Sequence, residues 1–187
     1  MNAAVFWFTG LSGAGKSTIC EIVQRRLAAD GLCIVVLDGD DVRQRLHRHL
    51  GFSPEDIAEN NALIAGLCEK ERNRCDLILV PIISPFRASR EAARKRLCEG
   101  FHEIHFDAPV ETVRGRDVKG LYAKADSGEI TGMIGIDPGV LYEPPKNPDL
   151  RLDTETETRD RSAGRLYDYI EAALGRNRGT GQTARPR

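Results

Sequence analysis

The sequence lacks any long apolar run and any pattern typical of secretion. No hydrophobic stretch approaches the roughly 20 residues that a membrane-spanning helix requires. The segment from Met1 to Phe8 runs directly into a strand-like pattern, without the basic region and the cleavage site that mark a signal peptide. We therefore expect neither a membrane partner nor a secreted protein.

The chain also has little net charge and no pattern of paired cysteines. Its 27 lysines and arginines against 28 aspartates and glutamates give a formal net charge of −1. This excludes a broad electrostatic field that would hold nucleic acid, so an anion must bind in a local site. The five cysteines are scattered, odd in number and form no C-x-x-C pair. We expect reduced thiols in a cytoplasmic protein.

What the sequence does contain is the composition and the pattern of a folded α/β protein. Its 187 residues, 41% hydrophobic and 29% charged, are typical of one globular domain. Apolar runs predict strands at residues 4–9, 32–37, 77–83, 101–106 and 151–153. Helical spacing predicts helices at residues 17–29, 42–50, 53–74, 89–97 and 160–174. This alternation predicts a parallel sheet with helices on both faces.

Two local signals mark helix ends. Ser53 is a good N-cap because Pro54 follows at the first helical position and two acidic residues complete the first turn. Gly31 is a C′ glycine after the helix that ends near Ala29.

Two stretches depart from the alternating pattern. Residues 117–150 are rich in glycine, proline and charge, and a loop of this length inside a compact domain is often a lid. Residues 175–187 are rich in arginine and glycine, which predicts a disordered tail or, as an alternative, an anion-binding arm. We therefore expect a domain over residues 1–174, with its lid at about 117–150, and a tail over 175–187.

The strongest motif is Gly10-Leu11-Ser12-Gly13-Ala14-Gly15-Lys16-Ser17, which fits G-x-x-x-x-G-K-[ST] between an apolar strand and a helix. Its glycines let backbone N–H groups turn inward and form an anion cradle. Lys16 is placed to reach the β- and γ-phosphates of ATP, and Ser17 to offer its hydroxyl to Mg²⁺. The motif makes the expected fold a P-loop NTPase-type α/β sheet with a lid.

Polar residues follow the second and third strands, where ligands of open parallel sheets bind. Asp38 and Asp40 are candidates to deprotonate an acceptor hydroxyl or to hold a Mg²⁺-bound water, and Arg43 is a candidate to bind an anionic acceptor. The alternative is an acidic turn that caps the next helix. Ser84 and Arg87 are candidates to bind a substrate phosphate, with an N-cap and a surface arginine as the equally weighted alternative.

Together these motifs resemble the adenylyl-sulfate kinases. The resemblance covers about residues 6–174 and rests on GLSGAGKST, LDGDDVR, LGFSPED, ISPFR, FDAPVE, RDVKGLYAKADSGEITG, GID and NPDLRLDT, in order and spacing. It implies transfer of the γ-phosphoryl group of ATP to the 3′-hydroxyl of adenosine 5′-phosphosulfate (APS), with Mg²⁺. It also implies a small-molecule nucleotide substrate and the possibility of a homodimer.

The resemblance also assigns roles to residues. The implied catalytic residues are Lys16, Asp38, Asp40 and Lys119, where Lys119 would reach the substrates when the lid closes. The implied ATP-binding residues are Gly10, Ser12, Gly13, Ala14, Gly15, Lys16, Ser17, Thr18 and Arg116. The implied acceptor-binding residues are Asp40, Arg43, Phe52, Asn60, Ile83, Ser84, Arg87, Lys119, Met133 and Ile134.

Three features depart from the family pattern. After F-S-x-E-D the family continues R-x-E-N-I-R-R, but here residues 57–63 read IAENNAL, so Ile57 stands where an arginine contacts the phosphosulfate end of the acceptor. Met133 stands where a phenylalanine stacks on the acceptor adenine, and the lid is about two residues longer after Gly-Ile-Asp. Either another cation (Arg43, Arg87 or Arg90) substitutes, or the acceptor differs.

Two alternative functions therefore stay open. The chain could phosphorylate a related nucleotide such as cytidine diphosphoramidate, or it could bind nucleotides without catalysis.

Overall fold

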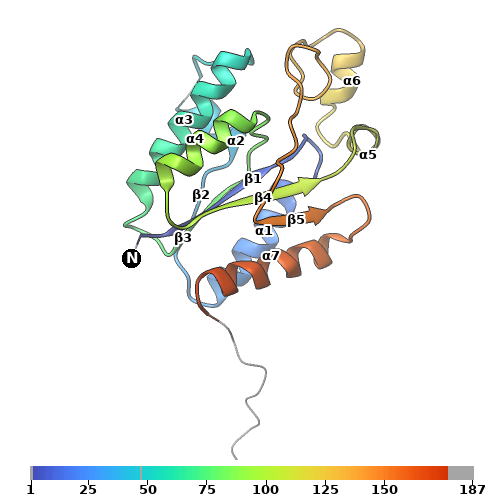
Figure 1. Cartoon of the computed structure of the whole chain (residues 1–187). Helices are drawn as coiled ribbons and strands as arrows, with labels where there is room; N and C mark the ends of the chain where they lie inside the picture. Colours follow the sequence, from blue (N-terminus) through green and yellow to red (C-terminus); the bar gives the residue numbers. More distant parts are fainter. Residues whose placement is uncertain (1, 47, 177–187) are drawn as a thin grey trace, which may run out of the picture.

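The structure, a computed structural model, describes residues 2–46 and 48–176 of the chain (Figure 1). Its centre is a five-stranded, all-parallel sheet with strand order β2-β3-β1-β4-β5. The strands are β1 (Ala4–Thr9), β2 (Ile34–Val36), β3 (Leu77–Val80), β4 (Phe101–Asp107) and β5 (Leu150–Asp153). The helices are α1 (Lys16–Ala29), α2 (Gly39–Arg45), α3 (Pro54–Glu71), α4 (Arg87–Leu97), α5 (Val110–Arg116), α6 (Leu121–Asp126) and α7 (Arg159–Ala173).

Helices cover both faces of the sheet, as the sequence predicts. In Figure 1, α1 and α7 lie against one face, and α3 and α4 lie against the other. The apolar run of the central strand β1 is continuous because both faces of this strand are buried. Phe6 and Phe8 pack in the core on the α1 and α7 side, while Val5 and Trp7 pack in the core on the α3 and α4 side. The parallel α/β prediction is confirmed.

Both predicted helix ends are present. The Ser53 hydroxyl accepts a hydrogen bond from the backbone N–H of Asp56, so Ser53 caps α3 with Pro54 in the first turn. Gly31 follows α1 with a φ of 85°, and its N–H donates to the carbonyl of Ala28. The serine side chain therefore marks where α3 begins, and the left-handed glycine marks where α1 ends.

Several predicted boundaries were wrong. Helix α2 begins at Gly39 rather than Val42, because Asp38 caps it through the N–H of Asp40. Strands β2 and β3 are shorter than predicted, and α4 begins at Arg87 rather than Ser89. Helix α5 was not predicted, since its seven residues include Gly115, which weakens a helical pattern.

The segment over residues 117–150 is not structureless. It contains α6, and the residue before this helix, Gly120, has a left-handed conformation with a φ of 65°. Figure 1 shows this segment rising beside the ends of α3 and α4. Most of the predicted tail, residues 177–187, lies outside the described residues.

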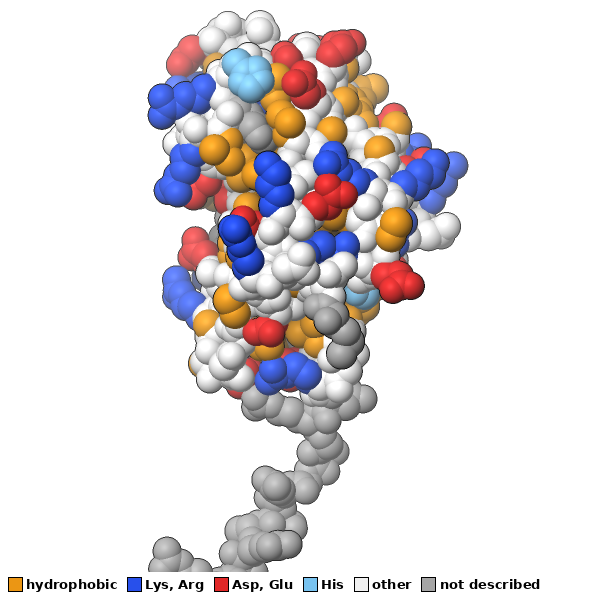
Figure 2. All heavy atoms as spheres, turned by 90° about the vertical axis from the view of Figure 1, so that its left-hand side faces the viewer, with side chains coloured by type: hydrophobic (Ala, Val, Ile, Leu, Met, Phe, Trp, Pro, Cys, Tyr) orange, Lys and Arg blue, Asp and Glu red, His pale blue; other side chains and the backbone are white. Residues whose placement is uncertain are grey.

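The described residues bear on three further expectations. None of their helices combines the length and the apolar character needed to cross a membrane. All five cysteines are free thiols. Figure 2 shows basic and acidic side chains interspersed on the face turned to the viewer, in keeping with the near-zero net charge.

Candidate active site

The glycine-rich loop leaves β1 and enters α1 at the carboxyl edge of the sheet. Gly10 cannot carry a side chain, because a Cβ there would lie 2.5 Å from the carbonyl oxygen of Phe106. Gly13 and Gly15 have φ angles of 80° and 89°, which L-residues with side chains rarely adopt. The glycine spacing of the motif is therefore required by the backbone.

Lys16 is buried at the first position of α1, and its ammonium folds back over the loop. Its Nζ donates to the carbonyl oxygens of Gly10 at 2.9 Å and Leu11 at 2.7 Å. Burial, together with the nearby cation of Lys119, lowers the pKa of Lys16 to about 7, although Asp38 and Asp40 act in the opposite direction. The loop thus holds a lysine whose charge depends on its surroundings.

Asp38 joins the loop to the second strand end. Its Oδ2 accepts a hydrogen bond from the Ser17 hydroxyl at 3.2 Å, and its Oδ1 accepts from the N–H of Asp40 at 2.9 Å. One aspartate therefore caps α2 and also faces the loop, so the capping alternative and the functional interpretation describe the same side chain.

The segment over residues 117–150 reaches this edge of the sheet in two places. Lys119 Nζ forms an ion pair with Asp40 Oδ2, and both side chains are more than half exposed. The buried Tyr122 donates its hydroxyl to the carbonyl of Ser12 at 2.9 Å. Burial raises the pKa of Tyr122 to about 12, so its hydroxyl stays protonated as a donor. The exposed ion pair is weak and can open, whereas the tyrosine contact is buried.

Arg43 contacts the stretch that follows α2 in this structure. Its Nη1 donates to the carbonyl oxygens of Leu50 at 3.0 Å and of Gly51, and its guanidinium lies 4.5 Å from the centre of the Phe52 ring. Desolvation lowers the pKa of Arg43, whereas Asp56 and Asp40 act to raise it. Phe52 is 56% exposed and lies close to Gly132 of the 117–150 segment.

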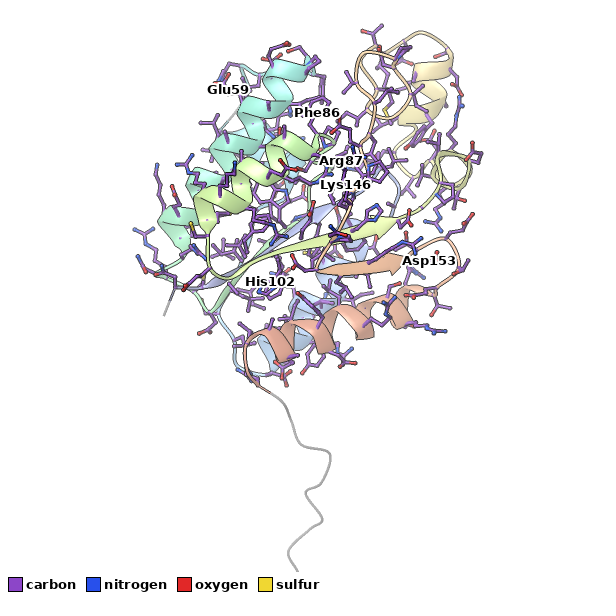
Figure 3. All side chains as sticks on the ribbon, in the orientation of Figure 1. Glu59, Phe86, Arg87, His102, Lys146 and Asp153 are labelled. Carbon is purple, nitrogen blue, oxygen red and sulfur yellow. The ribbon has the colours of Figure 1, made fainter. Side chains whose placement is uncertain are left out.

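The stretch after β3 places Ser84 at the cavity but not Arg87. Ser84 is buried, accepts a hydrogen bond from Trp7 Nε1 at 3.1 Å and has a φ of 44°, which is rare outside glycine. Arg87 Nε donates to the carbonyl of Pro144 at 2.8 Å. Figure 3 shows Phe86 and Arg87 at the end of α4 that faces the 117–150 segment. Arg87 therefore holds the end of that segment.

Arg90 is likewise engaged in structural contacts. It is 2% exposed, forms a 2.6 Å ion pair with Glu103 and donates to the carbonyl oxygens of Ser84, Pro85 and Glu143. Neither Arg87 nor Arg90 lies in the wall of the cavity. The expectation that one of these two arginines replaces the charge missing at position 57 is not supported by their contacts.

Ile57 lies in an apolar cluster rather than at an open anion site. It is 3% exposed and packs with Ile134 and Val140 of the 117–150 segment, with Ile83 and Phe86 at the margin. Val140 belongs to the part of the segment that is longer than the family pattern. The turn that presents it closes through Asp137, which accepts from the N–H groups of Gly132 and Gly139.

A cavity of about 710 Å³ brings most of the predicted site together. Its walls include Ser12, Gly13, Gly15, Lys16, Ser17, Thr18, Asp38, Asp40, Arg43, Phe52, Asn60, Ile83, Ser84, Lys119, Met133 and Ile134. The predicted residues Gly10, Ala14, Arg87 and Arg116 do not line it. Arg116 instead donates to the carbonyl of Thr154 at 2.6 Å, with a longer 3.5 Å contact to that of Gly13.

Tyr122 and Asn61 are two polar residues of the cavity wall to which the sequence analysis assigned no role. Tyr122 belongs to the motif RDVKGLYAKADSGEITG, and membership of that motif was the only signal that the sequence offered for it. Asn61 also lines the cavity, and an asparagine at a buried helix position was the only available signal. In the described part of the chain, no three histidine, cysteine or acidic side chains gather as metal ligands.

Comparisons with known proteins agree with this geometry. The family model described as "Adenylylsulphate kinase" matches residues 2–153. An adenylyl-sulfate kinase of Halothermothrix orenii is 49% identical over 170 residues, which are 88% of each chain. A bifunctional enzyme CysN/CysC of Xylella fastidiosa is 45% identical over 167 residues, which are 89% of this chain but 26% of that enzyme.

A solved structure is similar over nearly the same length. The APS kinase CysC of Mycobacterium tuberculosis, in complex with AMPPNP and APS, has a TM-score of 0.85 and 42% identity over 91% of this chain and 98% of its own. The residues matched by the family model include the phosphate loop and the 117–150 segment, and the chain belongs to the adenylylsulphate kinase family.

Proposed function

We propose that this chain is a nucleotide kinase that transfers the γ-phosphoryl group of ATP to the 3′-hydroxyl of APS. The observation that carries the proposal is that one cavity joins the Lys16 loop to Asp40 and Lys119, so that phosphate-binding and hydroxyl-activating groups face the same space. The family membership supports the same reaction, and the related Mycobacterium tuberculosis structure contains both AMPPNP and APS.

The loop would bind the triphosphate. Its inward N–H groups and the start of α1 favour anions, and Lys16 would exchange its bonds to Gly10 and Leu11 for bonds to the β- and γ-phosphates. The Ser17 hydroxyl and Asp38 supply the oxygen ligands that Mg²⁺ prefers, directly or through water. When bound, Mg²⁺ neutralises charge on the phosphates.

Asp40 would act on the acceptor. The 3′-oxygen forms its bond to the γ-phosphorus while the bond to the β–γ bridging oxygen breaks, ADP leaves, and the hydroxyl proton passes to Asp40. Lys119 would leave Asp40 and turn to the transferring phosphoryl group as the 117–150 segment closes as a lid. The exposure of the Asp40–Lys119 pair supports this exchange, because such a pair costs little to break.

The remaining acceptor-site residues would surround the nucleoside. Phe52 and Met133 offer an aromatic face and a thioether to a base, and Asn60, Ser84, Ile83 and Ile134 complete the wall. Mg²⁺ dependence and a cytoplasmic location are parts of the same proposal.

A second candidate is a kinase for a related nucleotide such as cytidine diphosphoramidate. The observation in its favour is that Ile57 and Ile134, which pack with Val140, form this part of the wall and contribute no cation to it. A terminal group with less negative charge would be compatible with this surface.

A coupled assay of ADP formation tests both candidates. The acceptors are APS, cytidine diphosphoramidate and a set of other nucleotides, and mass spectrometry locates the new phosphate. We expect turnover with APS and almost none without an acceptor. Turnover with cytidine diphosphoramidate alone would support the second candidate, and no turnover with any acceptor would support a nucleotide-binding protein without catalysis.

A further inference from the structure

Asn61 lies one helical turn after Ile57 on α3, and both residues line the cavity. Asn61 is 3% exposed, and its Nδ2 donates to the backbone carbonyl of Ile57 at 2.9 Å. This bond fixes the orientation of the amide, because only the nitrogen can donate to a carbonyl. The other amide atom, Oδ1, is therefore the one that is available as an acceptor.

The Oδ1 of Asn61 is buried and has no hydrogen-bond partner. Buried polar atoms of native proteins nearly always have a partner, and an acceptor left without one destabilises the fold. A leucine would fill the same space without this cost. The buried acceptor in a cavity wall therefore points to a ligand.

The surroundings of Asn61 define what kind of group that ligand presents. The neighbouring wall includes Ile57 and Ile134 of the apolar cluster, and among the described residues the cavity's only cations are Lys16, Arg43 and Lys119. An amide oxygen attracts N–H and O–H groups and repels the oxygens of an anion. Asn61 thus suits a neutral donor, and an anionic group would be repelled there.

We propose that Asn61 Oδ1 accepts a hydrogen bond from a neutral amino or hydroxyl group of the acceptor nucleotide, and that this bond helps to determine which nucleotide is phosphorylated. The proposal rests on the proposed function, since it assigns a specificity role within the same cavity. It makes the α3 wall the place where the nucleotide is distinguished by its donors, away from the phosphate loop.

The test combines one substitution in the protein with a series of nucleotide analogues, so that the loss of the acceptor atom and the loss of the donor group can be compared. Binding of APS, of its analogue without the 6-amino group and of its 2′-deoxy analogue is measured by calorimetry for the wild type and for Asn61→Leu. Leucine has nearly the shape of asparagine and a higher helix propensity, so the variant should fold, and its melting temperature checks this.

In the wild type, we expect removal of the recognised donor to weaken binding about tenfold, the scale of one neutral hydrogen bond. Asn61→Leu should weaken binding of APS by a similar factor and should bind that analogue no worse than APS. The KM for ATP should not change. Glu59→Gln, on the exposed side of the same helix, is the matched control and should behave as the wild type in every arm (Figure 3).

Three results would overturn the proposal. One is a loss of affinity from APS to the analogues that is as large in Asn61→Leu as in the wild type. Another is a variant in which only the melting temperature changes, since Oδ1 would then meet a water molecule. The third is a wild type that does not discriminate among the analogues, which can be measured even if the variant fails to fold.

The proposed function can fail independently of the role proposed for Asn61. If the wild type phosphorylates another nucleotide and not APS, the APS proposal is wrong, and the same test is run with that nucleotide and its analogues without amino or hydroxyl groups. A wild type that binds no acceptor nucleotide at all contradicts both proposals.

Discussion

The two halves of the cavity are built in opposite ways. The phosphate half comes from consecutive residues between β1 and α1, and its shape follows from glycines whose backbone admits no other residue. The acceptor half is assembled from α2, α3, the stretch after β3 and the 117–150 segment. Changes in the phosphate half should therefore affect one chemical step, whereas changes in the acceptor half should affect packing and specificity together.

The largest effect should come from Lys16→Ala in the phosphate half. The variant loses the ammonium that would stabilise charge on the transferring phosphoryl group, so we expect kcat to fall by about a thousandfold or more. The fold should persist, because Lys16 makes its hydrogen bonds within its own loop. Turnover and circular dichroism check the two statements, with the exposed Lys95→Ala as control. Turnover within tenfold of the wild type would contradict the phosphate-loop assignment.

Asp40→Asn tests the point where the two halves meet. The amide cannot take the hydroxyl proton, so kcat should fall by about a hundredfold or more while the KM for ATP changes little. The adjacent Asp41 is exposed and is the matched control through Asp41→Asn. A normal kcat with a strongly raised KM for ATP would instead place Asp40 in nucleotide binding.

Ile57→Arg tests the acceptor half. The resemblance to the family alone would predict a gained contact with the acceptor. The structure predicts a loss, because the guanidinium would enter an apolar cluster with Ile134 and Val140.

We expect the free energy of unfolding of Ile57→Arg to fall by about 2 kcal/mol in urea, and the acceptor KM to rise about tenfold. Ala58→Arg, on the exposed side of α3, should be nearly neutral. A lowered acceptor KM with unchanged stability would show that the position meets the anionic end of the substrate after all.

The same comparison explains how far the sequence could predict the molecule. The parallel sheet, the helices on both of its faces and the phosphate loop followed from patterns within short windows, since burial on both faces leaves a continuous apolar run such as β1. Asp38 could be assigned two roles before the structure because both depend on its immediate neighbours.

The acceptor half could not be predicted in the same way. That Ile57 packs against Val140 depends on where a segment about 80 residues later folds back, and no local pattern records this. Arg87 and Arg90 were candidates for anion binding because an arginine near the end of a parallel strand is often a ligand-binding residue. In the structure their guanidinium groups contact carbonyl oxygens and Glu103. The unpaired Oδ1 of Asn61 is visible only once its neighbours are placed.

The smallest predicted effect returns to Lys16 and concerns protons. In the unliganded loop the pKa of Lys16 is about 7, so at pH 8.5 its side chain is almost entirely neutral. A bound triphosphate would raise this pKa, because the anion stabilises the ammonium. The bound state then holds more protons than the free state, and the affinity for ATP should fall as the pH rises above 7, by at most tenfold per pH unit. Calorimetry at pH 8.5 in buffers of different ionisation enthalpy should show an uptake of about one proton, which Lys16→Ala should abolish. An uptake that persists in this variant would assign the proton to another group, and no uptake in the wild type would mean that Lys16 is already charged before ATP binds.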